Sequence, residues 1–428
     1  MFKTSPTDRS KTFFSQLDSI ARKTKLIVRY SPKFSASGYL LALLNAILTG
    51  KASFNQLAIN LKDSEPFSLS KQAVWKRTNT FAIAFMLEAL TLALLEKWQL
   101  SPIQIPQLKR HFKRVLVEDS THQKLPKSNH ELFPANGNGQ SVTAGMKVDL
   151  TVDLINGRAV SSRLHGATEQ DRDLGKDLVD MVKKRDLILR DRGYFILAEF
   201  ALIEKKGAYW LSRVPSNLFI WDADGGRLDE YFATAQGDTL DLQVKLGKER
   251  YQSRLVAIRA TAAVAEKNLR EARKRVKKVG KTLSKSQRLR CHWHIIVTNI
   301  PAEMLKASAI GELYRCRWNI EIIFRAWKQS ANLDKALNRQ SNEHHFQALM
   351  LAGMISQVLS LSMVSMIKPL HKGKRVSLEK LFDFISQFLS KCRALEDIWF
   401  DLPDPRHITM ECRKDRQPLE DTWIKLLS

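Results

Sequence analysis

The chain has 428 residues, of which 69 are Lys or Arg and 44 are Asp or Glu, so its formal net charge is +25. This charge favours a polyanionic partner, because each neutralised phosphate releases counterions, but it does not distinguish DNA, RNA and a membrane surface. The four cysteines lack C-x-x-C spacing, which argues against a zinc ribbon or a redox motif and fits a reducing cytoplasm.

Residues 1–100 predict a helical N-terminal region. Ser53–Leu61 is a short amphipathic stretch, and after a loop Ser68–Thr78 predicts a second helix that carries Lys76 and Arg77. A helix, a turn and a basic helix suit a helix-turn-helix motif, in which the second helix enters the major groove of DNA. Short helical hairpins are also common in helix-rich domains, so a purely structural role stays open.

Residues 101–213 change to short apolar strands that alternate with helices. Arg114–Ser120 and Leu187–Asp191 are apolar runs, with Asp119 near the end of the first and Asp191 at the end of the second. The other expected elements are the strands Gly145–Leu154 and Arg158–Leu164 around an Asn156-Gly157 turn, the helices Asp171–Lys184 and Phe195–Lys205, and the strand Ala208–Arg213. This order predicts an α/β fold with a ribonuclease-H-like mixed sheet, in which acidic residues lie at strand ends.

Residues 214–290 predict a β-rich insertion into this core. Residues 215–259 have the pattern of short strands, and Val264–Arg290 predicts a helix with eleven Lys or Arg against two Glu. Such a helix either binds phosphates or presents an ordinary solvated face. The strand His292–Thr298 returns to the core, which we expect to continue over 291–345.

Residues 346–428 predict a helical C-terminal region that could serve for dimerisation. Within it, Ala348–Ile367 runs for twenty residues without a charge, which is long enough to cross a membrane. Gln357 and four serines dilute its apolar character, so a buried core helix is the favoured interpretation.

The stretch Tyr314–Lys328 predicts one helix. With about 100° per residue, four polar residues of this stretch fall within an arc of about 60°: Tyr314, Arg317, Glu321 and Lys328. The adjacent arc is apolar and should be buried; it comprises Leu313, Ile320, Ile323, Phe324 and Trp327. Spacing alone also fits a salt-bridge ladder on a solvated face, formed by Arg317, Glu321 and Arg325.

The four polar residues form the pattern Tyr-x2-Arg-x3-Glu-x6-Lys, which resembles the signature of bacterial DDE transposases of the insertion-sequence-four family. Trp318, directly after the Arg, also fits this signature. The resemblance covers motifs from Asp119 to Lys328. It implies a cut-and-paste DNA transposase that cleaves transposon ends through hairpin intermediates and transfers the strands to target DNA.

The resemblance also implies that Asp119, Asp191 and Glu321 are the catalytic carboxylates. Phosphodiester cleavage requires activation of water and stabilisation of the departing oxygen, and divalent ions held by acidic oxygens do both. These three residues are therefore the expected metal ligands. The expected cofactor is Mg²⁺, with two ions bound and Mn²⁺ as a substitute.

The same resemblance assigns contacts to DNA. Tyr314, Arg317 and Lys328 would contact the transposon end near the cleaved bond, which their hydroxyl, guanidinium and ammonium groups suit. Trp293 occupies the place of an insertion-domain tryptophan that stacks a flipped base. A core strand aromatic is an equally open interpretation of Trp293.

Other acidic residues have plainer interpretations. Glu118 should point to the opposite face of its strand from Asp119. Asp149 and Asp153 lie four residues apart on one strand face and could line the site without binding the metal directly. Three further aspartates fit a solvated helix face or a helix end: Asp171, Asp173 and Asp186.

The expected partners are double-stranded DNA, as terminal inverted repeats and as target, and a second copy of the chain in a homodimeric DNA complex. We expect no membrane partner, and a cytoplasmic, nucleoid-associated protein, because the N-terminus lacks the apolar stretch of a signal peptide. Two other functions stay open: a structure-selective nuclease of the same fold, and a domesticated DNA-binding protein without catalysis.

Overall fold

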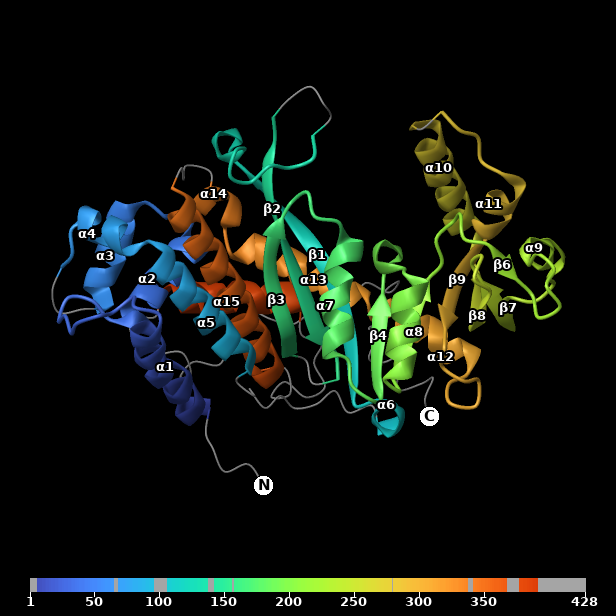
Figure 1. Ribbon diagram of the computed structural model, residues 1–428, viewed down its shortest axis with the longest axis horizontal. Helices are drawn as coiled ribbons and strands as arrows, with labels where there is room; N and C mark the ends of the chain where they lie inside the picture. The colour runs from blue at the N-terminus through green and yellow to red at the C-terminus, as the bar shows by residue number, and fades with distance from the viewer. Residues whose placement is uncertain are drawn as a thin grey trace. The chain divides into compact units, whose positions relative to one another are not determined.

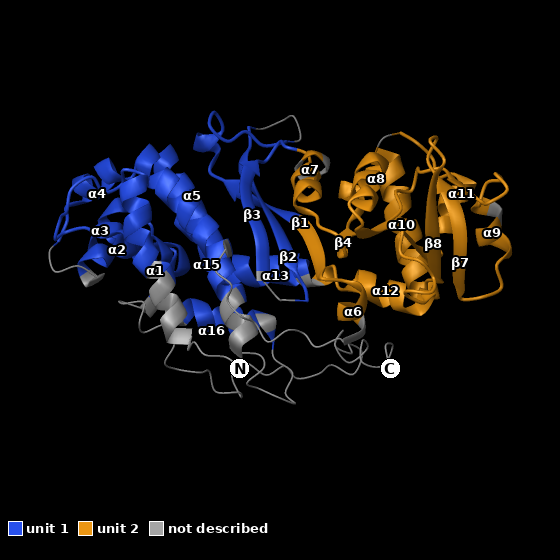
Figure 2. Cartoon of the chain, turned by 60° about the horizontal axis from the view of Figure 1, so that its bottom comes forward, with its two compact units in different colours: residues 1–103, 120–169, 320–412 blue, residues 104–119, 170–319, 413–428 orange. Residues whose placement is uncertain are grey.

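The structure is a computed structural model that describes residues 6–64, 68–95, 106–137, 142–155, 158–278, 280–337, 342–367 and 377–391. The chain divides into two compact units, coloured blue and orange in Figure 2. Unit 1 comprises Met1–Ile103, Ser120–Glu169 and Ile320–Cys412, and unit 2 comprises Gln104–Asp119, Gln170–Asn319 and Arg413–Ser428. The predicted Asn156-Gly157 turn and the chain after residue 391 lie outside the described residues.

Unit 1 is rich in helices. They are α1 (Pro6–Lys23), α2 (Ala36–Thr49), α3 (Phe54–Ser64), α4 (Lys71–Arg77), α5 (Thr80–Leu95), most of α13 (Trp318–Ser330), α14 (Leu333–Leu337), α15 (Glu343–Ile367) and α16 (Leu378–Lys391). The apolar helix α15 packs against both α2 and α5 (Figure 1). Ser35 begins α2, because its hydroxyl accepts a hydrogen bond from the Gly38 N–H, and Gly50 ends it in the left-handed region.

The segment with the length of a membrane span lies in α15 and forms part of the core of unit 1. All side chains from residue 348 to residue 361 are buried, which confirms the predicted core helix over this range. Among the helices that the structure describes, none combines the length and the apolar content needed to cross a bilayer.

Unit 1 also contains a β-hairpin and the second half of β1 (Arg114–Leu125). Strand β2 (Ala144–Asp153) pairs antiparallel with β3 (Arg158–Gly166), which confirms the hairpin that the sequence predicts. Every residue of β2 is buried, including Asp149 and Asp153. The Oδ1 atom of Asp153 accepts a hydrogen bond from the N–H of Ile155 and so begins the turn after the strand.

Unit 2 contains a mixed sheet with helices around it. The first half of β1 pairs parallel with β4 (Asp186–Arg190), and β4 pairs parallel with β5 (Tyr209–Arg213). The sheet continues antiparallel through β9 (Trp293–Thr298), β8 (Tyr251–Arg259), β7 (Thr239–Leu246) and β6 (Ile220–Trp221). The sheet confirms the predicted mixed α/β fold. The three strands of the predicted insertion, β6, β7 and β8, belong to the same sheet, and β9 connects them to β5 of the core.

The helices of unit 2 are mostly short. They are α6 (Pro106–His111), α7 (Asp171–Met181), α8 (Leu197–Lys205), α9 (Asp229–Thr234), α10 (Ala262–Lys278), α11 (Lys285–Arg290) and α12 (Ala307–Arg315), with the 3-10 turn η2 (Arg192–Tyr194) after β4.

The basic segment Val264–Arg290 is two helices, so the prediction of one helix was wrong. Gly280 adopts a left-handed conformation after α10, and the N–H of Lys281 bonds back to the carbonyl of Val276. A capping box between Ser284 and Gln287 then begins α11. Signals that end α10 and begin α11 therefore lie within a few residues of each other.

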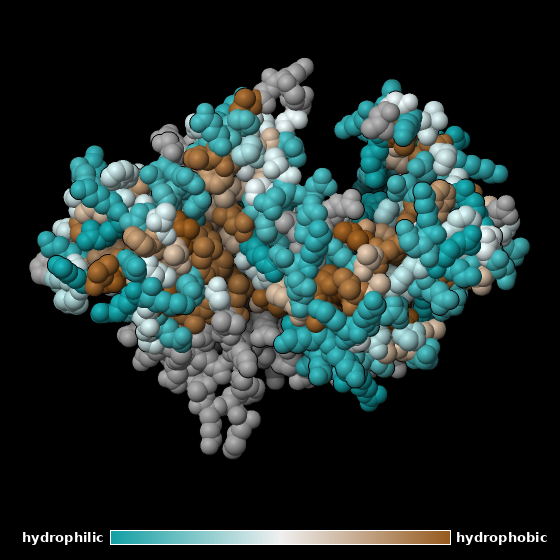
Figure 3. All heavy atoms as spheres, in the orientation of Figure 1, coloured by the Kyte–Doolittle hydropathy of each residue, from teal (hydrophilic) through white to brown (hydrophobic). Residues whose placement is uncertain are grey.

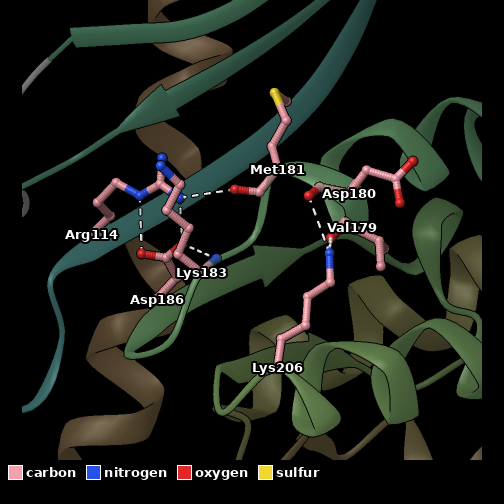
Figure 4. A network of polar contacts seen from close by, with 7 residues as sticks. All are labelled: Arg114, Val179, Asp180, Met181, Lys183, Asp186 and Lys206. Carbon is pink, nitrogen blue, oxygen red and sulfur yellow. Dashed lines mark hydrogen bonds and ion pairs between the residues drawn. The ribbon is translucent and has the colours of Figure 1, made fainter.

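Asp186 was predicted on a solvated helix face or at a helix end, and this prediction was wrong. It is buried at the start of β4, where its carboxylate accepts hydrogen bonds from Arg114 Nε at 3.0 Å and from the Lys183 N–H at 2.7 Å (Figure 4). Arg114 also donates to the carbonyl of Met181 at 3.1 Å, and Lys206 donates to two further carbonyls of α7. The network joins the starts of β1 and β4 and satisfies the end of α7.

Candidate active site

Two aspartates lie side by side on adjacent parallel strands. Asp191 directly follows β4 as predicted, whereas Asp119 lies in the middle of β1, which runs on to Leu125, so the prediction of a strand end near Asp119 was wrong. In the register of β1 and β4, Val117 lies opposite Leu189. Asp119 and Asp191 each follow this pair by two residues, so both lie at the same level and on the same face of the sheet. The side chain of Asp119 is 21% exposed, whereas Glu118, which precedes it, is 1% exposed. This difference confirms that Glu118 points to the opposite face.

Strand β5 places a positively charged residue, Arg213, beside Asp191. Arg190 lies opposite Ser212 on β5, so the next residue, Arg213, follows beside Asp191. Across the sheet Arg213 lies opposite Ile296 on β9. Arg213 was not among the predicted site residues, although it ends its predicted strand in the same way that Asp191 ends its own.

The predicted helix Tyr314–Lys328 is broken, and this correction separates the signature residues. Helix α12 ends at Arg315, and α13 begins at Trp318. In the turn between them, the N–H of Cys316 bonds to Leu313 O and that of Arg317 to Tyr314 O, both at 3.1 Å. Tyr314 therefore belongs to α12, while Glu321 and Lys328 belong to α13. The predicted apolar arc is buried as expected: Leu313, Ile320, Ile323, Phe324 and Trp327.

Tyr314 binds the backbone beside the aspartates. Its hydroxyl donates a hydrogen bond of 3.2 Å to the carbonyl of Arg190, the residue before Asp191. Burial raises the pKa of Tyr314 to about 12, with the charge of Arg317 acting against this shift and that of Asp191 adding to it. Tyr314 is therefore a protonated donor at neutral pH.

Arg317 is the cation that contacts an aspartate directly. Its Nη1 atom lies 3.3 Å from Asp119 Oδ2, and its guanidinium carbon lies 6.0 Å from the centroid of the Tyr314 ring. The residue is buried. Buried arginine beside a carboxylate is the arrangement that also suits a phosphate, because both anions accept two parallel N–H bonds.

More positive groups lie around Asp191 within unit 2. Burial and then the charge of Arg213 lower the pKa of Arg192, while Asp191 acts in the opposite direction. Burial, followed by the charges of Arg213 and Arg315, lowers the pKa of His294, which is therefore neutral at pH 7. The charges of Arg192 and Arg213 therefore repel each other beside Asp191. An anion bound here would relieve that repulsion.

Glu321 and Lys328 lie in unit 1. Glu321 is partly exposed on the first turn of α13, and Lys328 Nζ donates a hydrogen bond of 2.5 Å to the carbonyl of His122. Burial lowers the pKa of Lys328, and the charge of Asp334 partly counteracts this.

The acidic donors suit a hard divalent cation. Among the described residues, no three His, Cys, Asp or Glu side chains gather into a group that could hold a metal. Mg²⁺, however, is commonly bound through one or two protein carboxylates together with waters and substrate phosphates. The pair Asp119 and Asp191 meets this requirement, so the residues present fit the ion.

Residues 110–356 match the family model described as Transposase DDE domain, which is more than half of the chain. The chain belongs to the DDE transposase family. The transposase of insertion sequence IS231F from Bacillus thuringiensis subsp. israelensis is 28% identical over 364 residues, which cover 78% of this chain and 75% of that protein. The transposase of IS1151 from Clostridium perfringens is 24% identical over 401 residues, covering 88% of this chain and 84% of that protein.

Among solved structures, a piggyBac transposase synaptic complex with hairpin DNA matches with a TM-score of 0.41 and 9% identity, covering 100% of this chain and 77% of that chain. This likeness is too weak to carry an argument about the present protein.

Trp293 of this DDE transposase-family protein is a core residue. It is 3% exposed, its Nε1 donates a hydrogen bond of 3.3 Å to the carbonyl of Phe232, and the Arg259 guanidinium lies 4.3 Å from its ring. Of the two interpretations of Trp293, burial favours the core strand aromatic over the base-stacking residue.

The predicted helix-turn-helix residues lie in unit 1. Lys76 is exposed on α4, which begins after the N-cap Ser70. Arg77 packs over the ring of Phe34 at 5.2 Å and donates to the carbonyl of Ala73. The exposed charge of Lys76 is therefore the more accessible of the two.

Of the remaining aspartates, Asp173 lies on an exposed helix face as predicted, where it pairs with Lys176 at 3.5 Å. The side chain of Asp171 lies outside the described residues.

Proposed function

We propose that this protein is an insertion-sequence transposase that cleaves DNA at the ends of its element and joins them to target DNA. Asp119, Asp191 and Glu321 are its catalytic carboxylates in this proposal. The observation that supports it best is the pair of aspartates at the same level of two parallel strands, next to Arg317 and Arg213. Membership of the DDE transposase family and the names of the relatives point the same way.

In this proposal Asp119, Asp191 and Glu321 hold Mg²⁺ or Mn²⁺, as one or two ions. A bound divalent ion supplies an activated water and stabilises the departing oxygen. The protein's own residues bind and orient the DNA strand. Arg317 pairs with Asp119 in the structure. When DNA binds, Arg317 would release this carboxylate and bind a phosphate with two N–H groups instead.

Tyr314 and Lys328 are the other residues proposed to bind the DNA strand. In the structure each uses its polar group on a backbone carbonyl, those of Arg190 and His122 respectively. Both bonds place a hydrogen-bond donor at a fixed point of the chain, and a phosphate oxygen is a stronger acceptor than a carbonyl. We infer that DNA displaces at least the Lys328 bond, because an ammonium group is a freely rotating donor.

Helix α10 supplies a separate surface for the phosphate backbone. All of its cations are exposed: Lys267, Arg270, Arg273, Lys274, Arg275, Lys277 and Lys278. On the face drawn in Figure 3 this helix is covered mostly by hydrophilic side chains. The helix contains only two acidic residues, Glu266 and Glu271, so most of its positive charge is not neutralised within the helix. The repeated cations suit sequence-independent DNA binding.

The N-terminal and C-terminal regions of the chain are proposed to bind DNA and a second protomer, respectively. We propose that the helical region 1–100 binds the terminal inverted repeats through α4, that the catalytic core spans 101–213 and 291–345 around the insertion 214–290, and that 346–428 contributes to a homodimer. The insertion-sequence-four signature and a hairpin intermediate belong to the same proposal.

The test uses the purified full-length protein and DNA that carries the inverted repeats found beside its gene. With Mg²⁺, the wild-type protein should nick the element end, and Asp119→Asn, Asp191→Asn and Glu321→Gln should each abolish nicking while DNA binding is retained. A Glu321→Gln protein that cleaves at the wild-type rate would remove Glu321 from the site. Cleavage without strand transfer into a plasmid target would favour a structure-selective nuclease, and binding without cleavage a domesticated DNA-binding protein.

A further inference from the structure

Glu118 and Arg190, the residues directly before Asp119 and Asp191, form a buried ionic cluster with Glu199. Arg190 Nη2 lies 3.4 Å from Glu118 Oε2, and Arg190 Nη1 donates to Glu199 Oε2. All three side chains are buried. This arginine cluster (Glu118, Arg190 and Glu199) lies on the face of the sheet opposite to Asp119 and Asp191, because successive side chains of a strand alternate between faces.

Arg190 joins four elements of unit 2. Glu118 lies on β1, Arg190 ends β4, and Glu199 lies on α8. Arg190 Nη2 also donates a hydrogen bond of 2.5 Å to the carbonyl of Gly175 in α7. A Cβ atom at Gly175 would lie 3.1 Å from this nitrogen and 3.1 Å from the ring of Tyr194, so the glycine leaves room for the guanidinium. The planar fork of an arginine can serve several acceptors at once, whereas a lysine provides a single point charge.

We propose that the arginine cluster is a positioning device that keeps the middle of β1 in register with the end of β4, so that Asp119 and Asp191 bind the same divalent ion. The inference rests on the proposed function. The two aspartates repel each other, and a slip of one residue would turn either of them to the wrong face. A buried ion pair one residue before both aspartates resists the repulsion and the slip. Substitution of groups that orient metal ligands typically lowers metal affinity by about 10–100-fold.

The same two strands carry a second ion pair that serves as a matched control. Arg114 and Asp186 lie opposite each other at the starts of β1 and β4, five residues before Asp119 and Asp191 respectively. This pair also crosses between β1 and β4 and is also largely buried. A substitution there weakens the same sheet but lies away from the aspartates. It therefore separates an effect on position from a general loss of stability.

The experiment measures binding of Mn²⁺ alone to the full-length protein, by the electron paramagnetic resonance signal of the free ion. Arg190→Lys, which keeps the charge and loses the fork, should weaken Mn²⁺ binding by about tenfold or more. Arg114→Lys should leave Mn²⁺ affinity within about twofold of wild type. Hydrogen exchange measured without metal should be faster around residues 117–121 and 189–194 in Arg190→Lys and unchanged there in Arg114→Lys.

Glu118→Gln keeps the shape of the side chain and is measured in parallel, so that an unfolded Arg190→Lys protein does not end the test. It should weaken Mn²⁺ binding in the same direction. Wild-type affinity in both arginine-cluster variants, or an equal loss in Arg190→Lys and Arg114→Lys, would overturn the positioning role. Asp119→Asn separates the two proposals. If it binds Mn²⁺ as tightly as wild type, the proposed function fails; if it loses Mn²⁺ while Arg190→Lys and Glu118→Gln keep it, only the positioning role fails.

Discussion

Replacement of Asp186 by Asn removes one charge from a buried pair without changing the shape of the side chain. The Asp186 carboxylate accepts hydrogen bonds from Arg114 and from the N–H of Lys183, and an amide has only one acceptor oxygen for these donors. Removal of one partner from a buried pair costs about 3–5 kcal/mol. Arg114 is 16% exposed and keeps its bond to Met181, which lowers the expected cost to about 2–3 kcal/mol.

Hydrogen exchange of peptides from β1 and β4, followed by mass spectrometry, measures this cost locally. Asp186→Asn should lower the free energy of opening of these strands by the stated amount. The control is Asp173→Asn in α7, whose partner Lys176 is exposed, so it should change the opening free energy by less than about 0.5 kcal/mol. If Asp186→Asn altered exchange no more than Asp173→Asn, the network in Figure 4 would contribute little, and the reasoning from burial would be refuted.

Three further predictions concern single side chains. Tyr314→Phe loses the bond to the Arg190 carbonyl, which should cost about 1 kcal/mol in thermal unfolding and slow cleavage only a few-fold; a loss above about a hundredfold would place the hydroxyl on the reacting phosphate instead. Burial lowers the pKa of His345 from 6.5 to about 4, so the unfolded chain binds a proton between these values that the folded chain does not, and stability falls as the pH drops through this window. His345→Phe, which keeps the ring stacked on Phe54, should reduce that loss by up to about 2 kcal/mol between urea unfolding at pH 7 and at pH 4.5, and an unchanged pH dependence would contradict it. Trp293→Ala should lower stability by about 3–5 kcal/mol and impair nicking and hairpin formation equally; selective loss of hairpin formation in a stable variant would restore the base-stacking role.

The strands that carry the aspartates could be predicted from the sequence because their pattern is local. A short apolar run followed by an acid is visible in the sequence at both Asp119 and Asp191. The parallel register that places them at one level is a tertiary feature, set by the pairing of β1 with β4. The buried arc of α13, in contrast, follows from helical periodicity.

The features that the sequence did not reveal depend on residues far apart in the chain. Arg190 and Glu118 are 72 residues apart, and nothing in the local pattern distinguishes a buried arginine from a solvated one. The break at Cys316 and Arg317 contains neither Gly nor Pro, so helical periodicity runs through it undisturbed. Tyr314, before that break, bonds to the end of β4, and Arg317, within it, pairs with Asp119 in β1; both are tertiary contacts.

Iron-directed cleavage of the polypeptide tests most directly whether the three carboxylates share an ion. Fe²⁺ replaces Mg²⁺ at oxygen-ligand sites, and with ascorbate and peroxide it cuts the backbone close to where it is bound. The proposal predicts cuts near Asp119, Asp191 and Glu321 in the protein bound to end DNA, and loss of all three cuts in Asp191→Asn. Cuts near the two aspartates without one near Glu321, or cuts that persist in Asp191→Asn, would contradict a shared metal site.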